Sequence, residues 1–83
     1  MGAPRIAIEV ASPGNAAEEL DLKIDQYLRN GSQAVWVGYP KRKAIVRLAL
    51  TAGRVRAAEY RSGEILPEQI GTTPCEFDPA VFF

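Results

Sequence analysis

The chain of 83 residues is predicted to be an α+β protein with an α/β-like core: a mixed β-sheet with one crossover helix, followed by a C-terminal antiparallel meander. Two observations predict this fold class. Residues 6–40 read as strand, turn, helix and strand, and residues 44–60 read as two strands joined by a short turn. The first order favours a parallel pair connected by the helix, and the second favours an antiparallel hairpin. At this length we expect one domain, residues 1–83.

The first strand is expected over residues 5–10, where apolar and β-branched residues alternate with others. Ile6, Ile8 and Val10 then point to one face of the sheet, and Ala7 and Glu9 point to the other.

A helix is expected over residues 16–30. Asn15 is a good N-cap, and Glu18 three residues later completes a capping box. Gly31 is the natural C-cap. The predicted apolar face of this helix consists of Leu20, Ile24, Tyr27 and Leu28.

Three further strands are expected. Residues 34–39 form an apolar run typical of a buried strand, and Pro40 ends it. Residues 44–50 and 54–60 read as a hairpin around Ala52-Gly53. Residues 65–83 read as a Pro- and Gly-punctuated tail with one short strand near 75–77, and the terminal Val81, Phe82 and Phe83 are expected to dock. The sheet face away from the helix is expected to stay open unless another chain covers it.

The composition excludes several classes of protein. No stretch is apolar and long enough to cross a bilayer, and the start of the chain lacks a secretory signal. A single cysteine, Cys75, fits a reducing cytoplasm and reads as a small, partly buried hydrophobe. Because histidine is absent, Ser-His and Cys-His nucleophile pairs and imidazole-bound zinc are excluded within this chain. Carboxylates and lysine remain for any chemistry.

The net charge of zero hides a segregation of charge. Residues 41–61 hold seven basic residues against Glu59 alone, and Lys41, Arg42 and Lys43 form a cluster at a predicted turn. This cluster is a candidate contact for nucleic-acid phosphates. The alternative is a solvated sheet face that the acidic C-terminal third balances.

Two spaced patterns stand out: Ile8-Glu9-Val10-x-Ser12-Pro13, and Lys23 followed at fixed offsets by Tyr27, Gly31, Trp36 and Pro40. Gly63-Glu64-Ile65-Leu66 and Val81-Phe82 follow later in the chain. With these patterns the chain resembles the second half of the Uma-two family, a bacterial family of restriction-endonuclease-like proteins within the PD-(D/E)XK nuclease superfamily. The resemblance covers nearly the whole chain and implies the second half of a restriction-endonuclease-like fold.

The resemblance also implies a site. Glu9 matches the family's second acidic metal ligand, and Lys23 matches a lysine carried on the helix, since the usual strand position is Ala11 here. A metal-dependent endonuclease of this kind uses magnesium, held here by Glu9, and acts on DNA. Lys23 would orient a water molecule or stabilise charge on the attacked phosphate. From the residues alone, Glu9 as a solvent-facing strand residue and Lys23 as a partner of Glu19 remain alternatives.

The chain also departs from the family pattern. The family's first acidic ligand lies well upstream of the matched glutamate, and only eight residues precede Glu9 here. We therefore expect a partial domain that is weakly active or inactive as a nuclease by itself, since one carboxylate is a poor magnesium site. The alternative function is a non-catalytic module that retains half of the fold and binds a partner, or itself as a homodimer, through the uncovered sheet face.

Overall fold

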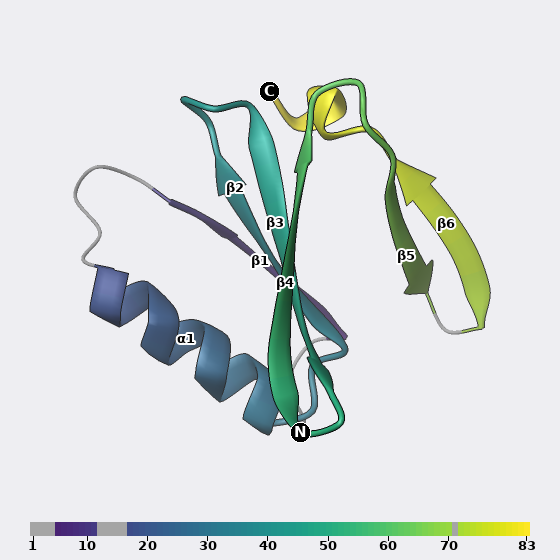
Figure 1. Cartoon of the computed structure of the whole chain (residues 1–83). Helices are drawn as coiled ribbons and strands as arrows, with labels where there is room; N and C mark the ends of the chain where they lie inside the picture. The colour runs from purple at the N-terminus through teal and green to yellow at the C-terminus, as the bar shows by residue number, and fades with distance from the viewer. Residues whose placement is uncertain (1–4, 12–16, 71) are drawn as a thin grey trace.

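A four-stranded mixed sheet lies between one helix and a two-stranded hairpin (Figure 1). The computed structural model describes residues 5–11, 17–70 and 72–83. The sheet has the order β1-β2-β3-β4. The elements are β1 (Ile6–Val10), α1 (Ala17–Arg29), β2 (Ala34–Tyr39), β3 (Ala44–Thr51), β4 (Arg54–Arg61), β5 (Leu66–Ile70), β6 (Thr73–Phe77) and the 3-10 helix η1 (Pro79–Phe82). The predicted mixed sheet with one crossover helix is confirmed.

The strand directions follow the predicted connections. β1 and β2 are parallel, with Ile8 opposite Trp36, and α1 connects them. The pairs β2–β3 and β3–β4 are antiparallel. Ala52 and Gly53, which join β3 to β4, both have positive φ angles of 52° and 78°. Two consecutive positive angles are typical of the type I′ turn, which matches the twist of a hairpin.

The predicted apolar face of α1 packs on the sheet. Ile24 and Leu28 are buried in one cluster with Ala7, Val35 and Val37. The side chains of β1 and β2 alternate between the two faces, so every second residue of these strands meets the helix.

The C-terminus of α1 is capped as the sequence predicts. Gly31 has a φ of 102°, and its N–H donates to the Leu28 carbonyl at 3.3 Å. The Ser32 N–H donates to the Tyr27 carbonyl at 2.9 Å, which completes a Schellman motif. The predicted N-cap, Asn15, and the turn at Ser12 lie outside the described residues.

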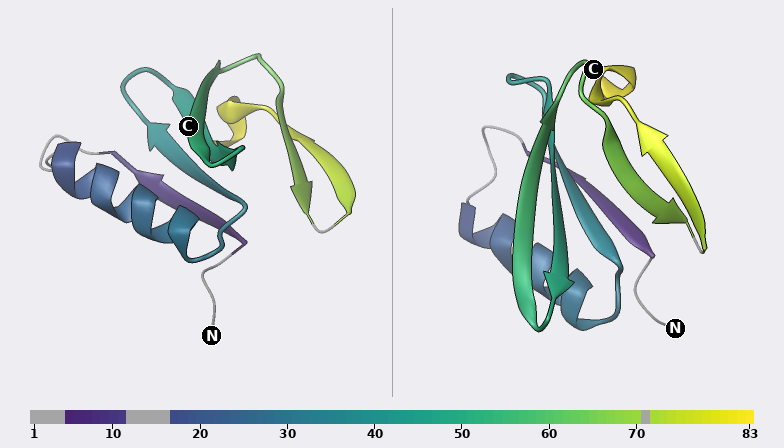
Figure 2. Two further views of the ribbon diagram at one scale, coloured as in Figure 1. Left: turned by 60° about the horizontal axis from the view of Figure 1, so that its bottom comes forward. Right: turned by 45° about the vertical axis from the view of Figure 1, so that its right-hand side comes forward.

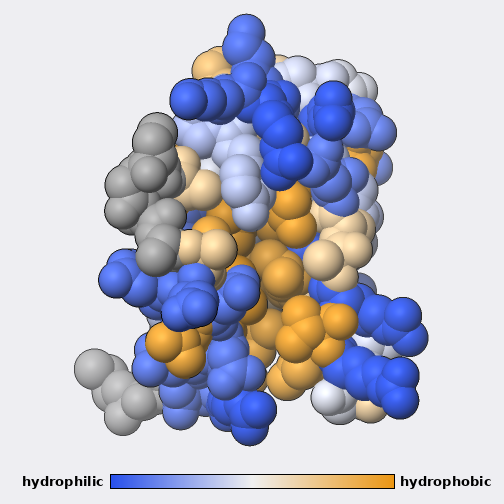
Figure 3. Space-filling view, turned by 60° about the vertical axis from the view of Figure 1, so that its left-hand side comes forward, coloured by the Kyte–Doolittle hydropathy of each residue, from blue (hydrophilic) through white to orange (hydrophobic). Residues whose placement is uncertain are grey.

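The sheet face away from α1 is covered rather than open, contrary to the sequence expectation. The β5–β6 hairpin and η1 pack on this face, as both views in Figure 2 show. Leu66 of β5 and Trp36 of β2 are buried there together with Ile45 of β3. The open apolar surface instead lies beside α1, where Leu50 and Val55 are exposed, and Figure 3 shows hydrophobic side chains gathered on this side between polar regions.

The expected tail is structured, and the strand β5 was missed by sequence reasoning. β5 and β6 pair antiparallel, with Glu68 opposite Cys75. β5 reads Leu-Pro-Glu-Gln-Ile, and a proline beside two polar residues argues against a strand by composition. Pro67 is tolerated here because the hairpin has only two strands, so β5 has a free edge.

The docking of the chain end is confirmed for its aromatic residues. The Phe82 ring meets Trp36 edge-on, with centroids 6.1 Å apart, and the Phe83 ring lies against Gly38. Val81 stays exposed, so the expectation is wrong for this residue. Asp78 fixes the segment, because its Oδ1 accepts hydrogen bonds from the N–H groups of Gly63 and Ala80, both at 2.9 Å.

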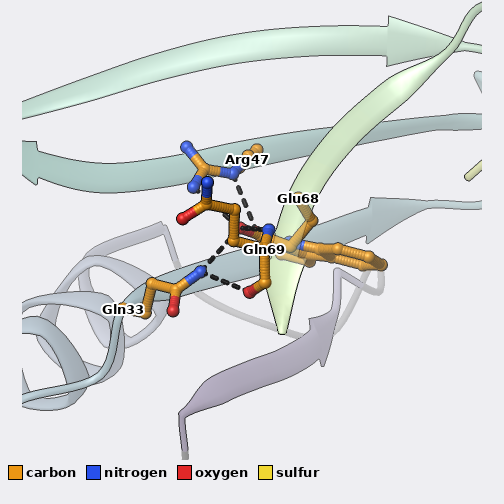
Figure 4. A network of polar contacts seen from close by, with 5 residues as sticks. Gln33, Arg47, Glu68 and Gln69 are labelled. Atoms are coloured by element: carbon orange, nitrogen blue, oxygen red, sulfur yellow. Dashed lines mark hydrogen bonds and ion pairs between the residues drawn. The ribbon is translucent and has the colours of Figure 1, made fainter. Parts of the chain in front are cut away.

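One buried carboxylate joins the hairpin to the sheet (Figure 4). Glu68 is 4% exposed. Its Oε1 accepts from Trp36 Nε1 and Arg47 Nε, both at 2.8 Å. Its Oε2 accepts from Arg47 Nη2 and Gln33 Nε2, both at 2.9 Å, and from the Gln69 N–H at 3.1 Å. Burial would raise the pKa of Glu68, but these hydrogen bonds outweigh it and lower the pKa from 4.5 to about 2.

The Glu68 carboxylate predicts a loss of stability in acid. A carboxyl group with a lowered pKa stabilises the folded state above its unfolded pKa of 4.5, and this contribution is lost as the pH falls toward about 2. The contribution is about 3 kcal/mol, because each pKa unit corresponds to about 1.4 kcal/mol. Urea unfolding followed by the fluorescence of Trp36, the single tryptophan, measures it. Glu68→Gln should lower the free energy of unfolding at pH 7 and flatten its dependence on pH below 4.5.

Glu76→Gln, on the same hairpin, is the control and should behave like the wild type, because Glu76 is exposed. Equal pH dependence in Glu68→Gln and wild type would contradict the assignment.

Candidate functional site

Glu9 lies under the helix, on the sheet face that α1 covers. Ala7, two residues earlier in β1 and therefore on the same face of the sheet, is buried against α1. Glu9 is opposite Val37, near the end of the edge strand β1, and is half-buried. The Tyr27 hydroxyl donates a hydrogen bond to Glu9 Oε1 at 3.3 Å. The strand alternation that predicted the orientation of Glu9 is therefore confirmed, but its partner was not predicted.

Lys23 lies one helical turn before Tyr27, so its position is on the same stripe of α1 as the residue that contacts Glu9. Its side chain is exposed. Among the described residues, no carboxylate lies within 4.0 Å of the Lys23 ammonium group, so neither Glu9 nor Glu19 is its partner. The structure thus brings Glu9 and Lys23 to one layer without joining them.

The basic turn lies at the same end of the sheet as Glu9. β1 and β2 run parallel, with Val10 opposite Gly38, and the turn that holds Lys41, Arg42 and Lys43 follows the end of β2 (Figure 1). All three side chains are exposed.

Arg42, in this turn, contacts an aromatic ring and a carboxylate. Its guanidinium carbon lies 4.4 Å from the centre of the Tyr39 ring, and its Nη2 is 3.3 Å from Glu59 Oε1. Glu59 also pairs with Arg61 at 2.9 Å. Lys41 and Lys43 are the members of the turn whose charges have no ion-pair partner in the described part of the chain.

A single carboxylate does not fit a magnesium ion. Within residues 5–11, 17–70 and 72–83, no three Asp, Glu, Cys or His side chains gather where they could hold a metal. Glu9 offers one oxygen that already accepts a hydrogen bond from Tyr27. Magnesium usually takes one or two carboxylates together with substrate phosphates, so these residues alone leave the ion short of ligands.

A wide groove lies elsewhere, on the other face of the sheet. It has a volume of about 800 Å³ and runs between β3 and the β5–β6 hairpin. Arg47 and Glu68, in its wall, are paired with each other. Sequence reasoning missed Glu68 because nothing local distinguishes it from the surface acids near it. Its hydrogen bonds keep the pair in place, so we assign this polar cluster a structural role.

The profile of the Uma2 family, described as "Putative restriction endonuclease", matches residues 1–76. The chain belongs to the Uma2 family. The resemblance to the Uma-two family inferred from the sequence patterns is therefore confirmed. No curated protein matches the chain.

The Uma2 chain also shares its fold with a solved structure, titled as a "putative nuclease belonging to DUF820" from Anabaena variabilis. The TM-score is 0.69, at 18% sequence identity. The match covers 83% of this chain and 37% of the other, so the chain spans well under half of that protein's length. The likeness shows a nuclease-like fold. No helix in the described parts of the chain is long and apolar enough to span a membrane.

The hydrogen bond between Tyr27 and Glu9 predicts a small effect on stability. Tyr27→Phe keeps the packed ring but removes the donor, so we expect the free energy of unfolding to fall by about 1 kcal/mol. The matched control is Tyr39→Phe, since no hydrogen bond of the Tyr39 hydroxyl is found within the described residues. Urea unfolding of both variants is the measurement. A loss no larger in Tyr27→Phe than in Tyr39→Phe would show that this hydrogen bond does not stabilise the fold.

Proposed function

We propose that this chain is part of a metal-dependent endonuclease of the PD-(D/E)XK type, in which Glu9 and Lys23 are the functional residues. The observation that carries the proposal is the half-buried Glu9 carboxylate under a helix that presents Lys23 one turn from Tyr27. Membership of a family described as restriction endonucleases supports a DNA substrate. The proposal treats residues 1–83 as one partial domain, acting in the cytoplasm.

The chain's own residues have limited roles in this proposal. Glu9 would be one ligand of a divalent cation such as magnesium, and a further carboxylate has to come from outside the described residues. The Lys23 ammonium group would stabilise negative charge on a phosphate near the end of β1. Tyr27 would hold the Glu9 carboxylate in position through its hydrogen bond. Because the set is incomplete, cleavage by this chain alone should be weak.

The basic turn gives the proposal a place for the DNA backbone. Lys41, Arg42 and Lys43 lie at the same end of the sheet as Glu9, which is near the C-terminal end of β1. Phosphate contacts from lysine position a nucleic acid without reading its sequence.

The second candidate function is a non-catalytic module that binds a partner or a second copy. The exposed apolar residues of β1 and of the surface beside α1 favour it, since exposed apolar patches mark interaction sites.

Cleavage of supercoiled plasmid with magnesium or manganese distinguishes the two functions. We expect slow nicking by the wild type, and Glu9→Ala and Lys23→Ala should each reduce its rate by about a hundredfold, the size typical for loss of a group that stabilises charge in the transition state. Glu19→Ala and Arg29→Ala, exposed on the same helix, are charge-matched controls that should keep the wild-type rate. Absence of cleavage by the wild type, or equal rates in all variants, would favour the non-catalytic module.

Retention on DNA tests the basic turn separately. Binding of a short duplex should weaken with salt, and Lys41→Gln with Lys43→Gln should lower the slope of log K against log salt by roughly two, about one for each phosphate contact. Arg54→Gln with Arg56→Gln removes the same charge from the opposite end of the β3–β4 hairpin and should leave the slope closer to the wild type. Equal slopes in both double variants would count against the turn as the contact.

A further inference from the structure

The edge strand β1 presents apolar side chains to solvent. β1 pairs only with β2, so its other edge is free of any strand among the described residues. Ile8 is 59% exposed and Val10 is 57% exposed. Both line an apolar trough of about 130 Å³ that Phe82 and Phe83 close from the side. An apolar edge of this kind is a template for another strand.

The hydrogen bonds to β2 show which main-chain groups of β1 point outward. The Arg5 carbonyl accepts from the N–H groups of Gln33 and Ala34, and the Ala11 N–H donates to the Gly38 carbonyl. Residues 5 and 11 therefore face β2, and so do 7 and 9, because the direction alternates along a strand. The main-chain groups of Ile6 and Ile8 face the open edge.

The other edge of the sheet differs. β4 carries Arg54, Arg56 and Arg61, all exposed. Charged side chains along an edge discourage pairing with a further strand, and two such strands would bring arginines together. β1 is therefore the edge suited to association.

We propose that two copies of this chain pair through β1, antiparallel, about a two-fold axis at Ala7. Ile6 of each copy then lies opposite Ile8 of the other, and their outward main-chain groups exchange hydrogen bonds. Arg5 of each copy lies opposite Glu9 of the other. The four-stranded sheets of the two copies join into one continuous sheet, with the same surface used by both, as a two-fold interface requires.

Charge selects this register among the possible ones. A two-fold axis at Glu9 would place the Glu9 residues of the two copies opposite each other, so that like charges meet. A two-fold axis at Ile8 would place Glu9 opposite Ala7, and no charged pair would form. A two-fold axis midway between two residues would place residues whose main-chain groups point outward opposite residues whose groups point toward β2. The hydrogen-bond ladder between the two copies could not form in that register. Only the arrangement about Ala7 gives two opposite-charge pairs, which stabilise directly facing strands.

Glu9 also makes the pairing selective. A carboxylate on the packed face of an edge strand normally discourages unspecific strand addition. Here the Tyr27 hydroxyl occupies only Oε1 of Glu9, so Oε2 remains for an arginine on the facing strand. A strand without a basic residue at that position would leave the half-buried carboxylate unpaired.

Sedimentation of the chain over a series of concentrations tests the dimer. The wild type should pass from monomer to dimer, and Ile8→Lys should abolish the dimer, since the lysines would oppose Ile6 across the axis. The matched control is Leu22→Lys on α1, where Leu22 is 62% exposed, and it should associate like the wild type. A wild type that is monomeric at every concentration, or that associates only with a different polypeptide, would overturn the proposal.

A charge exchange tests the register. Arg5→Glu alone and Glu9→Arg alone each create two like-charge pairs, so each should weaken self-association by about tenfold. An equal mixture of the two variants restores both opposite-charge pairs and should form a heterodimer of near wild-type affinity. Trp36 fluorescence checks that each variant is folded. Should Glu9→Arg not fold, Arg5→Glu alone tests the register, with Arg29→Glu on α1 as the control that should associate like the wild type.

A mixture that associates no better than its separate components would overturn the register. Neither experiment contains DNA or metal, so its outcome is independent of the nuclease proposal.

Discussion

The hydrogen bonds between the Glu68 carboxylate and the sheet determine how the β5–β6 hairpin packs on the sheet face away from α1. Burying an acid is costly unless its oxygens are satisfied, and Arg47 and Trp36 of the sheet supply the donors. Because these donors belong to β2 and β3, the hairpin can pack only where they point. The position of Leu66 over Trp36 and Ile45, and the path of the chain to Phe82, follow from that placement.

The sequence could predict those elements whose signals are local. The alternation around Glu9, the apolar stripe with Ile24 and Leu28, and the turn at Ala52-Gly53 each lie within a few residues of the structure they specify. β5 could not be predicted, because it is held to the sheet by a glutamate whose side-chain partners are 21 to 35 residues away in the chain. A residue that looks like a surface acid locally is here the centre of a buried cluster.

The candidate site was only half accessible to sequence reasoning. The period of two in β1 put Ala7 and Glu9 on one face, but it could not say that this is the face α1 covers. The family resemblance chose Glu9 and Lys23, and the structure places them in one layer without joining them. The sequence predicted only a packing role for Tyr27, because the position of a tyrosine on an apolar helix face does not indicate which group its hydroxyl will hydrogen-bond.

The two proposals for this chain make competing demands on Glu9. In the paired sheets, Arg5 of a second copy would sit beside Glu9 and neutralise the carboxylate that a divalent cation needs. The two Glu9 residues would lie about 14 Å apart, four strand residues along and one strand across, too far to share an ion. A second copy therefore cannot supply the missing carboxylate. A polypeptide that supplies it by pairing with β1 would use the same edge, and in that arrangement self-association and completion of the nuclease site exclude each other.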